Sequence, residues 1–495
     1  MQVTVTRKDV KFNPDPSRVI ARYHFLNEER SKNIIRKVLD MPENDVKIAL
    51  NQVLRGYSKR HRNISRIFEN HFNKLSGIIN ELDINPDDIG EYMRVLIGSY
   101  FTLEYSIESA AFFNPSIVED PDQSELRTGQ KRVILSFRAT GEGHISSIVF
   151  RSGILDENSD LIIEPVGKML DEAGKIKRYI YNKETLQTEL HELQDNNKKI
   201  TSKVFSKLDD NFTYGELERS VSQTRKEHKL SASKELQFKQ IMWLASAHYE
   251  IEFSLDTAIS ERVIFPVSEN ERKGIEDARF VKFVDDDGEV TYYATYTAYD
   301  GLTILPKLLE TKDFYHFIIK PINGEVGRNK GLALFPRKVN GKYAMLCRLD
   351  GVNNYISFSD DINIWHEAKL IQEPKYSWEF IQIGNCGSPI ETEEGWLVLT
   401  HAVGQMREYV LGASLFDLDN PEKEIGRLKA PLMMSNETER EGYVPNVLYT
   451  CGAITHNGML NIPYAMSDYA SSFACVNLRE LLDELKTPDN ILKIN

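Results

Sequence analysis

The chain has 495 residues, with 61 Lys and Arg against 74 Asp and Glu, so its formal net charge is −13. Apolar residues make up 41% of it and aromatic residues 10%, which is enough for large cores and excludes a chain disordered throughout. The acidic balance argues against a general binder of nucleic acid or of anionic membranes, because both need clustered cations. The length allows about two to four domains, or one large fold with insertions.

The sequence also indicates a compartment. It contains no run of 18 apolar residues that could span a bilayer, and its N-terminus lacks the apolar segment of a secretory signal, so we expect a cytoplasmic protein. The four cysteines lie singly, without the spacing of a zinc site, and we expect reduced, mostly buried thiols: Cys347, Cys386, Cys451 and Cys475. No metal or organic cofactor is expected.

Two stretches have a helical pattern. After an extended or irregular lead-in over residues 1–20, apolar residues recur at three- and four-residue spacings from 27 to 112. A second, charged helical stretch runs from 181 to 248 between regions rich in strands. Both are too long for loops of a compact β domain, and amphipathic helices bury their apolar side against something. We therefore expect the two stretches to pack on one another and to form a homo-oligomer contact.

The rest of the chain shows a strand repeat. Five segments share an apolar or aromatic run that ends in a polar or charged residue, and from the second segment onward they recur every 50 to 65 residues: 133–143, 292–301, 342–351, 395–404 and 460–468. Repeats of this length, each several strands long, are typical of β-propeller blades. The sequence therefore predicts a mainly β, five-bladed propeller in these parts: an N-terminal helical extension (1–112), the first part of the propeller (113–180), a helical insertion (181–248) and the remainder of the propeller (249–495).

The repeat predicts where chemistry would take place. Each run ends where an inner strand would reach one end of the central channel, and the residues at these five ends are Arg138, Thr297, Arg348, His401 and Asp468. Taken alone, each is typical of a strand end at the surface. At equivalent places in a repeat they predict one convergent polar site.

Two adjacent carboxylates, Glu276 and Asp277, precede a strand and are followed by Arg279. Neighbouring side chains of a strand point to opposite faces, so we expect only one carboxylate to face the channel. The other carboxylate and Arg279 would be structural parts of the wall. Burial would raise the pKa of an acid in an enclosed channel and suit it to donate a proton.

A hairpin is predicted around Asn340-Gly341, the dipeptide that most favours a two-residue β-turn. Antiparallel pairing would bring Lys330 and Arg348 to the same end of this hairpin. Two cations there would suit an anion such as phosphate, although they could equally be surface cations paired with acids. His401 is expected at the level of Arg348. Some of the aromatic residues could form a floor on which a sugar stacks, and the rest are core: Tyr296, Tyr299, Trp365, Tyr409, Tyr443 and Tyr464.

Residues 111–150 and 270–475 resemble glycoside hydrolase family 130, the inverting β-mannoside phosphorylases and related β-mannosidases. The resemblance implies a five-bladed propeller to which the two helical stretches are additions. It is carried by motifs in a fixed order: Asn114-Pro115, Phe137-Arg138, Glu276 to Arg279, Ala333 to Pro336, Asn340 to Tyr343, Arg348, Phe358 to Asp361, Ile383-Gly384, Pro389-Ile390, Gly395-Trp396, His401, Leu411 to Ala413, Pro445 to Val447, Tyr464 and Asp468.

The resemblance implies a mechanism. Asp277 matches the single acid, which protonates the glycosidic oxygen through the 3-hydroxyl of the mannosyl unit, while phosphate attacks from the opposite face to give α-mannose 1-phosphate. In the phosphate clamp Arg348 and His401 match, Lys330 stands where the family has an Arg, and Gln382 stands where it has a Lys, so one cation is missing. The residues expected to bind the sugar are Asn114, Arg138, Glu276, Asn446, Asp468 and Tyr409.

We therefore expect an inverting phosphorylase of β-1,2- or β-1,4-linked manno-oligosaccharides, with phosphate as co-substrate and the oligosaccharide as its other partner. Gln382 motivates one alternative, an inverting β-mannosidase that uses water. Inverting hydrolysis needs a second carboxylate as base, and the sequence does not single one out. The other alternative is a propeller that only binds glycans, against which the presence of Asp277 argues.

Overall fold

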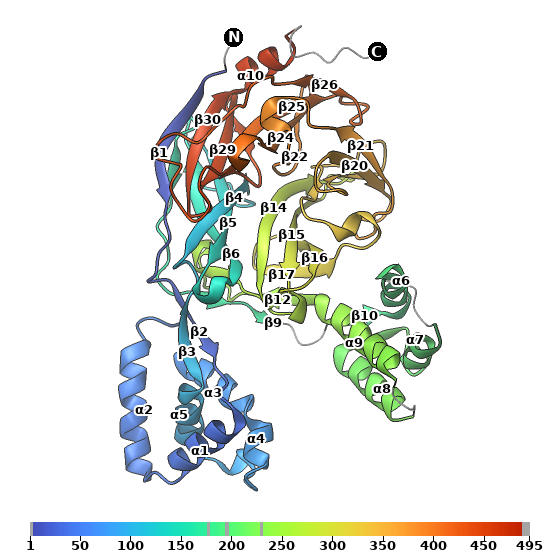
Figure 1. The fold of residues 1–495 in the computed structure, drawn as a ribbon. Coiled ribbons are helices and arrows are strands. Elements are labelled where there is room, and N and C mark those ends of the chain that lie inside the picture. The colour runs from blue at the N-terminus through green and yellow to red at the C-terminus, as the bar shows by residue number, and fades with distance from the viewer. Residues whose placement is uncertain (1–2, 176–178, 194–197, 228–230, 488–495) are drawn as a thin grey trace.

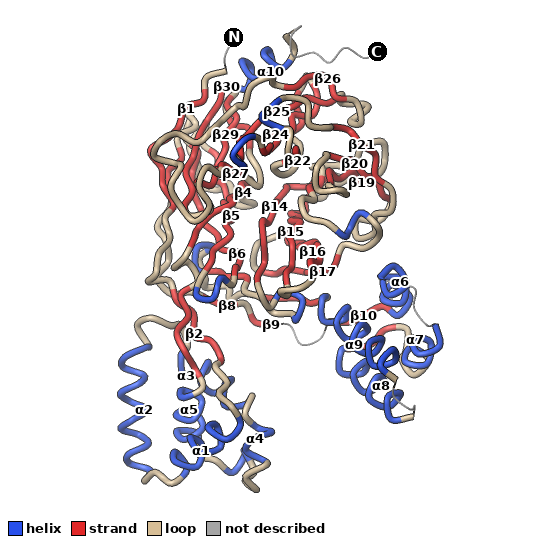
Figure 2. The backbone as a smooth tube through the Cα atoms, in the orientation of Figure 1, coloured by secondary structure: helices blue, strands red, loops and turns tan. Residues whose placement is uncertain are grey.

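A computed structural model describes residues 3–175, 179–193, 198–227 and 231–487, and shows a mainly β protein with two groups of helices (Figures 1 and 2). The ends of the predicted ranges 1–112 and 249–495, residues 176–178 of the predicted range 113–180, and residues 194–197 and 228–230 of the predicted insertion lie outside the described residues. Within the described ranges, no helix combines the length and the apolar character needed to cross a membrane.

The strands of the body form, in the described residues, five consecutive antiparallel groups of four. The first two groups are followed by three more of the same design. In chain order they are β4 (Ala111–Glu119), β5 (Lys131–Thr140), β6 (Ser146–Leu155) and β7 (Leu161–Ile163); β14 (Gly274–Val284), β15 (Val290–Tyr299), β16 (Ile304–Thr311) and β17 (His316–Pro321); β18 (Ala333–Leu334), β19 (Tyr343–Cys347), β20 (Asn354–Ser359) and β21 (Ala368–Gln372); β22 (Gln382–Asn385), β24 (Gly395–Val403), β25 (Tyr409–Phe416) and β26 (Glu424–Arg427); β27 (Leu448–Tyr449), β29 (Met459–Met466), β30 (Ala470–Asn477) and β1 (Val5–Phe12).

Each repeat segment of the sequence is the second strand of its group. In Figures 1 and 2 the first strands β4, β14 and β22 lie towards the middle of the body, and β1, β17, β21 and β26 lie at its periphery. The polar residues at the end of the second strands therefore lie beside the start of the first strands, because antiparallel neighbours begin where their partners end.

Strand β1 completes the last group. It pairs antiparallel with β30, from Val5 opposite Val476 to Phe12 opposite Ser471, so the two ends of the described chain lie together (Figure 1). The lead-in expected over residues 1–20 is thus partly a regular strand. The range 1–112 is accordingly not helical throughout, since its first strand belongs to the sheet of the C-terminal strands.

The N-terminal helices are enclosed between β2 (Val19–Tyr23) and β3 (Thr102–Ser106), which pair with each other. Asn27 caps the first helix by accepting a hydrogen bond from the backbone N–H of Arg30 at 2.9 Å. The helices bury their apolar sides in a core of their own, with Phe68, Phe72 and Leu96 at its centre. They are α1 (Glu28–Leu39), α2 (Glu43–Tyr57), α3 (Ile64–Asn73), α4 (Ser76–Asn80) and α5 (Glu91–Tyr100).

The second group of helices precedes β12 (Tyr249–Glu252), which joins the edge of the second strand group beside β17. Its helices also share one core, around Leu217, Phe238 and Leu244. A capping box of Thr213 and Glu216 begins the third of them. They are α6 (Lys183–Leu193), α7 (Lys198–Phe205), α8 (Tyr214–Lys226) and α9 (Ala232–Ala247).

The expectation that the two helical stretches pack on one another is wrong. Their cores are separate clusters that share no residue, and Figure 1 shows them apart, at the lower left and lower right of the body. Each group buries its own apolar sides, so neither needs the other. The N-terminal helices instead meet the segment before β13 (Arg262–Ile264) through Arg62, which pairs with Asp256 at 2.8 Å and Glu261 at 3.0 Å.

A buried ion pair joins β16 to the segment that leads into β14. Lys307 and Glu271 are both fully buried, and the Lys307 Nζ lies 2.8 Å from the Glu271 Oε1. The hydroxyls of Tyr249 and Tyr296 donate to the same carboxylate at 2.9 and 2.7 Å. Burial alone would raise the pKa of Glu271, but Lys307 and these hydrogen bonds lower it to about 2.

Removing one partner of this pair should leave an uncompensated buried charge. We predict that Lys307→Met lowers the free energy of unfolding by about 3–5 kcal/mol. Lys312→Met is the matched control, because Lys312 pairs with Glu289 at the surface, and it should cost at most about 1 kcal/mol. Urea unfolding of both variants measures the difference, and equal losses would contradict the importance of the buried pair.

Candidate functional site

Two β-bulges start the site. The register of β4 shifts between Phe113 and Ser116, and that of β14 shifts between Glu276 and Arg279. Asn114 and Asp277 lie in these bulges with left-handed backbones, at φ 49° and 54°. Residues other than glycine rarely adopt this conformation, and bulges re-aim side chains. Here the Asn114 Nδ2 donates to the Asp277 Oδ1 at 2.7 Å and joins two first strands.

The bulge in β14 puts both adjacent carboxylates on one side. Arg138, near the end of β5, donates from Nη2 to the Glu276 Oε1 at 2.9 Å, and its Nη1 lies 3.4 Å from the Asp277 Oδ1. The expectation that only one carboxylate faces inward is therefore wrong. It assumed regular strand alternation, which the left-handed Asp277 interrupts.

The pKa values of Asp277 and Asp468 shift in opposite directions. Burial would raise the pKa of Asp277, but the positive charges of Arg138 and Arg279 and the Asn114 hydrogen bond hold it below its ordinary value. The expected raised pKa at this residue is thus wrong. Burial and the neighbouring Asp277 charge instead raise the pKa of Asp468 to about 6. Of these two carboxyls, Asp468 therefore keeps its proton to the higher pH.

Arg348 and His401 both pack against the backbone of Gly384. A Cβ atom at Gly384 would lie 2.7 Å from the His401 Cε1 and 2.9 Å from the Arg348 Cδ, so a larger residue would displace both side chains. The Arg348 Nη2 donates to the Gly351 carbonyl and, at 3.3 Å, to the Gln382 Oε1. Gln382 thus holds the cation in place without adding charge.

The ring of His401 is fully buried. Its Nδ1 lies 3.0 Å from the Asn385 carbonyl, which can only accept, so the proton sits on Nδ1 and a neutral ring leaves Nε2 as an acceptor. The Gln382 Nε2 lies 3.5 Å from that atom. Burial and the charges of Arg348 and Arg279 lower the pKa of His401 well below its ordinary value. The ring of Tyr409 stacks parallel to it, with centroids 6.3 Å apart.

The predicted hairpin is confirmed, but its cations separate. Asn340 and Gly341 have φ 52° and 77°, and Val339 pairs with Lys342 across the turn. The Lys330 Nζ pairs with Glu276, and the Lys330 side chain is half exposed. Lys330 therefore joins the acids around Arg138, and does not complete a pair with Arg348.

The remaining predicted residues lie on the last group and in the cores. Asn446 and Asp468 have left-handed backbones, at φ 59° and 50°, and the Asn446 Oδ1 accepts from Arg440 at 2.8 Å. Thr297 is buried opposite Glu276 in the sheet. Of the candidate stacking aromatics, the fully buried ones are core residues: Tyr296, Trp365 and Tyr464.

Two further residues belong to the site, Arg279 and Tyr449. The Arg279 Nη2 donates to the Tyr449 hydroxyl at 2.6 Å, and the Tyr449 ring lies 5.0 Å from that of His401. The sequence pattern predicts a structural role in the wall for Arg279 and none for Tyr449. A usable signal was present, because Tyr449 follows the motif residue Asn446 closely and Arg279 lies two residues after Asp277.

Several buried polar atoms of the site have no partner in the described residues. They are the Asn114 Oδ1 and the Nε atoms of Arg138, Arg279 and Arg348. Buried donors and acceptors without partners are costly, so these atoms indicate a polar ligand. Acids around Arg138 beside cations around His401 suit a hydroxyl-rich molecule next to an anion. Across the described ranges, no group of three or more His, Cys, Asp and Glu side chains could hold a metal ion.

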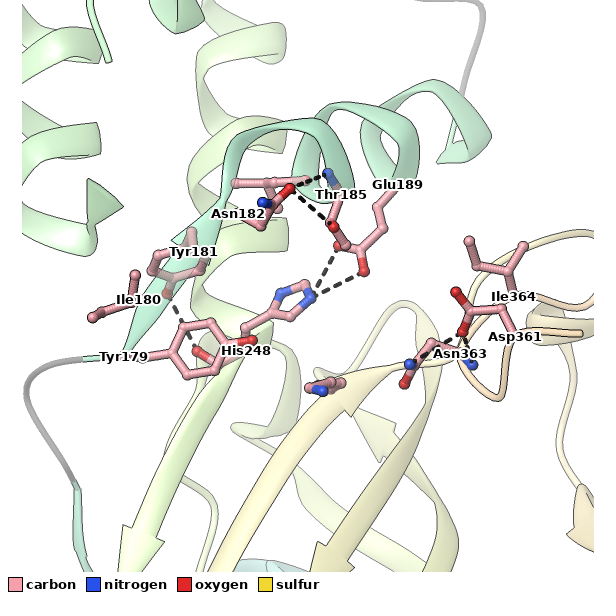
Figure 3. Close-up of a pocket in the computed structure, with 12 residues that line it drawn as sticks. Tyr179, Ile180, Tyr181, Asn182, Thr185, Glu189, His248, Asp361, Asn363 and Ile364 are labelled. Atoms are coloured by element: carbon pink, nitrogen blue, oxygen red, sulfur yellow. Dashed lines mark hydrogen bonds and ion pairs between the residues drawn. The ribbon is translucent and has the colours of Figure 1, made fainter. Parts of the chain in front are cut away.

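A separate pocket of about 200 Å³ lies between α6 and the residues around Asp361 (Figure 3). His248 and Glu189 form a buried pair at its wall, 2.9 Å apart. The His248 Nδ1 also faces a backbone carbonyl, that of Leu244 at 3.1 Å, so this ring serves to hold α6 on the end of α9. None of the predicted site residues lines this pocket.

Comparisons with known proteins found similar proteins of one family. A family model described as beta-1,4-mannooligosaccharide phosphorylase matches residues 216–487. A 1,2-beta-oligomannan phosphorylase of Thermoanaerobacter sp. (strain X514) is 35% identical over 221 residues, which are 43% of this chain and 72% of that protein. A beta-1,2-mannobiose phosphorylase of Listeria innocua is 29% identical over 297 residues, 59% of this chain and 80% of that protein. A solved structure of a beta-1,2-mannobiose phosphorylase from Listeria innocua matches 77% of this chain and 93% of its own, with 23% identity and a TM-score of 0.46.

The opposite pKa shifts of Asp468 and Asp277 predict opposite effects on stability. The raised pKa of Asp468 stabilises the fold below about pH 4, and this contribution is lost as pH rises to about 6. From pH 4 to pH 8 the wild type should therefore lose about 1–3 kcal/mol of unfolding free energy that Asp468→Asn, which has no carboxyl here, does not lose. The lowered pKa of Asp277 gives stability that is present above the unfolded pKa of about 4 and is lost only at lower pH. Asp277→Asn should therefore be destabilised by nearly the same amount at pH 4 and at pH 8. Urea unfolding of both variants at both pH values tests this, and a difference from the wild type that does not change with pH in Asp468→Asn would contradict it.

Proposed function

Because the chain belongs to glycoside hydrolase family 130, we propose that it cleaves β-linked manno-oligosaccharides with inorganic phosphate and releases α-mannose 1-phosphate. The observation that carries the proposal is the partly buried Arg348 with the buried His401, near the acids around Arg138 and without a carboxylate partner of their own in the described residues. Such a pair suits an anionic co-substrate. Relatives named as phosphorylases of β-1,2- and β-1,4-linked mannosides support the reaction class.

In this proposal the sugar lies against the bulges. Asp277 faces the glycosidic oxygen, and the hydroxyls of the mannosyl unit bind side chains from several strand groups. Left-handed backbones at three of these positions, Asn114, Asn446 and Asp468, are the kind of strain that persists where a ligand needs a fixed direction. The side chains assigned to the sugar are Asn114, Arg138, Glu276, Asn446, Asp468 and Tyr409.

The proton would come from the coupled acids. Burial and the Asp277 charge raise the pKa of Asp468 to about 6, while Arg138 and Arg279 lower that of Asp277, so in the free protein the proton of this pair belongs to Asp468. Binding of a sugar removes water from Asp277 and disfavours its charged form, which brings that proton to it. It then passes, through the 3-hydroxyl, to the leaving oxygen as the bond from that oxygen to the anomeric carbon breaks.

The phosphate nucleophile would bind on the side of the anomeric carbon opposite the leaving oxygen. A phosphate oxygen forms the new bond to the anomeric carbon, while Arg348 and His401 hold the remaining oxygens. The acceptor Nε2 of the neutral His401 fits the one hydroxyl of hydrogen phosphate, and Arg348 fits its anionic oxygens. The neutral Gln382 orients Arg348. Attack opposite to the leaving oxygen inverts the anomeric centre.

The five strand groups support a five-bladed propeller, which we propose as the architecture behind this site. A pocket of about 380 Å³ at the opposite ends of the first strands is lined by residues in or just after the first strand of every group, among them Ile117, Val281, Pro336, Pro389 and Ile454. First strands of different groups are also joined directly. The Cys451 N–H donates to the Pro115 carbonyl at 2.7 Å, between the last group and the first.

Gln382 favours the alternative, inverting hydrolysis, because it leaves the anion site one cation short. Hydrolysis needs a base about 6.5–9.5 Å from the acid, on the other side of the sugar. The carboxylates of the site, Glu276, Asp277 and Asp468, all interact with Arg138 on the side of the acid. Arg348 and His401 occupy the side where a base would act, which favours phosphorolysis.

The test is to incubate the protein with β-1,2- and β-1,4-mannobiose, with and without phosphate. We expect cleavage of at least one substrate to need phosphate, with mannose 1-phosphate as product. Arsenate should replace phosphate and yield free mannose, because it resembles phosphate and its sugar ester hydrolyses. Full-rate release of free mannose in phosphate-free buffer would overturn the proposal in favour of the hydrolase, and binding without cleavage would favour a glycan-binding protein.

Asp277→Asn should lower kcat by about 10²–10⁴-fold, the usual contribution of general acid catalysis. Glu276→Gln is the matched control, since it removes the neighbouring carboxylate, and it should act mainly on KM for the mannoside. Steady-state kinetics of the two variants separates them. An inactive Glu276→Gln beside an active Asp277→Asn would transfer the acid's role to Glu276.

A further inference from the structure

The guanidinium of Arg279 is buried near both the acid and His401, since its charge lowers the pKa of each. Arg279 is only 4% exposed, and its side chain reaches the site from β14, just after the bulge. The Nη2 donates to the Tyr449 hydroxyl at 2.6 Å, and the Nη1 donates to the Asp277 carbonyl at 3.3 Å. These two contacts fix the plane of the group. The Nε–H is buried and has no partner in the described residues.

Arg279 and Arg348 form a pair of like charges. Burial lowers the pKa of Arg348, and the charge of Arg279 lowers it further. Both charges also act on His401. In the described residues neither guanidinium has a carboxylate at ion-pair distance. Arg279 is buried and Arg348 is partly buried. The Asp277 charge favours the charged form of Arg279, but an anion bound by both guanidiniums would also relieve the repulsion between them.

The other candidate cation is held elsewhere. The Lys330 Nζ pairs with Glu276, and its side chain is 47% exposed, whereas Arg279 is buried. Moving Lys330 to Arg348 would break its ion pair and leave the 13% exposed Glu276 with Arg138 alone. The positive charge around the acceptor nitrogen of His401 therefore comes from Arg279 and Arg348.

We propose that Arg279 is a direct ligand of the phosphate co-substrate, together with Arg348 and His401, and that Lys330 is not. The inference rests on the proposed function and names a residue of that site which the family pattern did not assign. The unpartnered Nε–H, with the adjacent Nη2, provides the edge that binds an oxyanion. The bulge explains the placement, because the Arg279 side chain projects from β14 two residues after the acid and lies near both the acid and the proposed phosphate site.

The test measures phosphate binding to the free protein, by calorimetry with inorganic phosphate, for Arg279→Gln, Arg348→Gln and Lys330→Met. Loss of one charge-assisted ligand should raise the phosphate Kd about 10- to 100-fold in both arginine variants. Lys330→Met is the matched control and should stay within about threefold of the wild type. An unchanged phosphate Kd in Arg279→Gln overturns the proposal, even if its kcat falls, because that split would show a positioning role. A loss in Lys330→Met as large as in Arg348→Gln overturns it too.

Two further variants keep the result interpretable. If Arg279→Gln fails to fold, Arg279→Lys keeps the buried charge but loses the planar edge, and should raise the phosphate Kd by at least about fivefold; an unchanged Kd overturns the proposal. Tyr449→Phe keeps the ring against His401 and removes one fixing contact of Arg279, so a smaller rise is expected. Failure of the proposed function itself is distinguishable, since the wild type would then bind no phosphate and release free mannose.

Discussion

The hydrogen bond from Asn114 to Asp277 is the contact on which the site depends. It joins the first strands of two groups, and each partner lies in a bulge with a left-handed backbone. Such backbones cost about 1–3 kcal/mol each, so the surrounding sheet must over-determine them. The regular pairing of β4 with β5 and of β14 with β15 on both sides of the bulges does this. Rigid strands thereby direct a carboxylate that regular alternation would have turned away.

The site separates charge into two halves. Glu276, Asp277 and Asp468 surround Arg138, and across from them Arg279 and Arg348 lie beside a neutral His401. Both halves are largely buried, so their charges act over short distances with little screening. In the proposed function, the acids supply the proton and the cations hold the phosphate that attacks the anomeric carbon. The glycines at 331 and 384 make room for the Arg348 side chain between two strand groups.

Much of this could be predicted from the sequence, for reasons that are visible in particular residues. The Asn340-Gly341 turn specified its hairpin, and apolar runs ending in polar residues marked the second strand of every group. What failed depended on tertiary contacts. A bulge has no sequence signature, so the inward turn of both Glu276 and Asp277 and the lowered pKa of Asp277 could not be foreseen. The sequence allowed Lys330 to bind either an acid or a phosphate beside Arg348, and the structure shows it paired with Glu276.

For the helices, too, the sequence pattern predicted the local structure but not the tertiary packing. The periodicity of residues 27–112 and 181–248 identified helices, but not that each group would close a core of its own. Strand β1, separated from its partner β30 by most of the chain, is a long-range pairing that local patterns do not indicate.

In the proposed reaction, a bound phosphate displaces the leaving oxygen from the anomeric carbon in one step, with a single carboxyl as the acid. Proton and phosphorus NMR of the first product formed from a β-mannobiose tests this. We expect α-mannose 1-phosphate, formed with inversion. A first product in the β configuration would require two displacements and a covalent intermediate, and free mannose in the presence of saturating phosphate would show that water and not phosphate attacks; either result would contradict the proposed reaction.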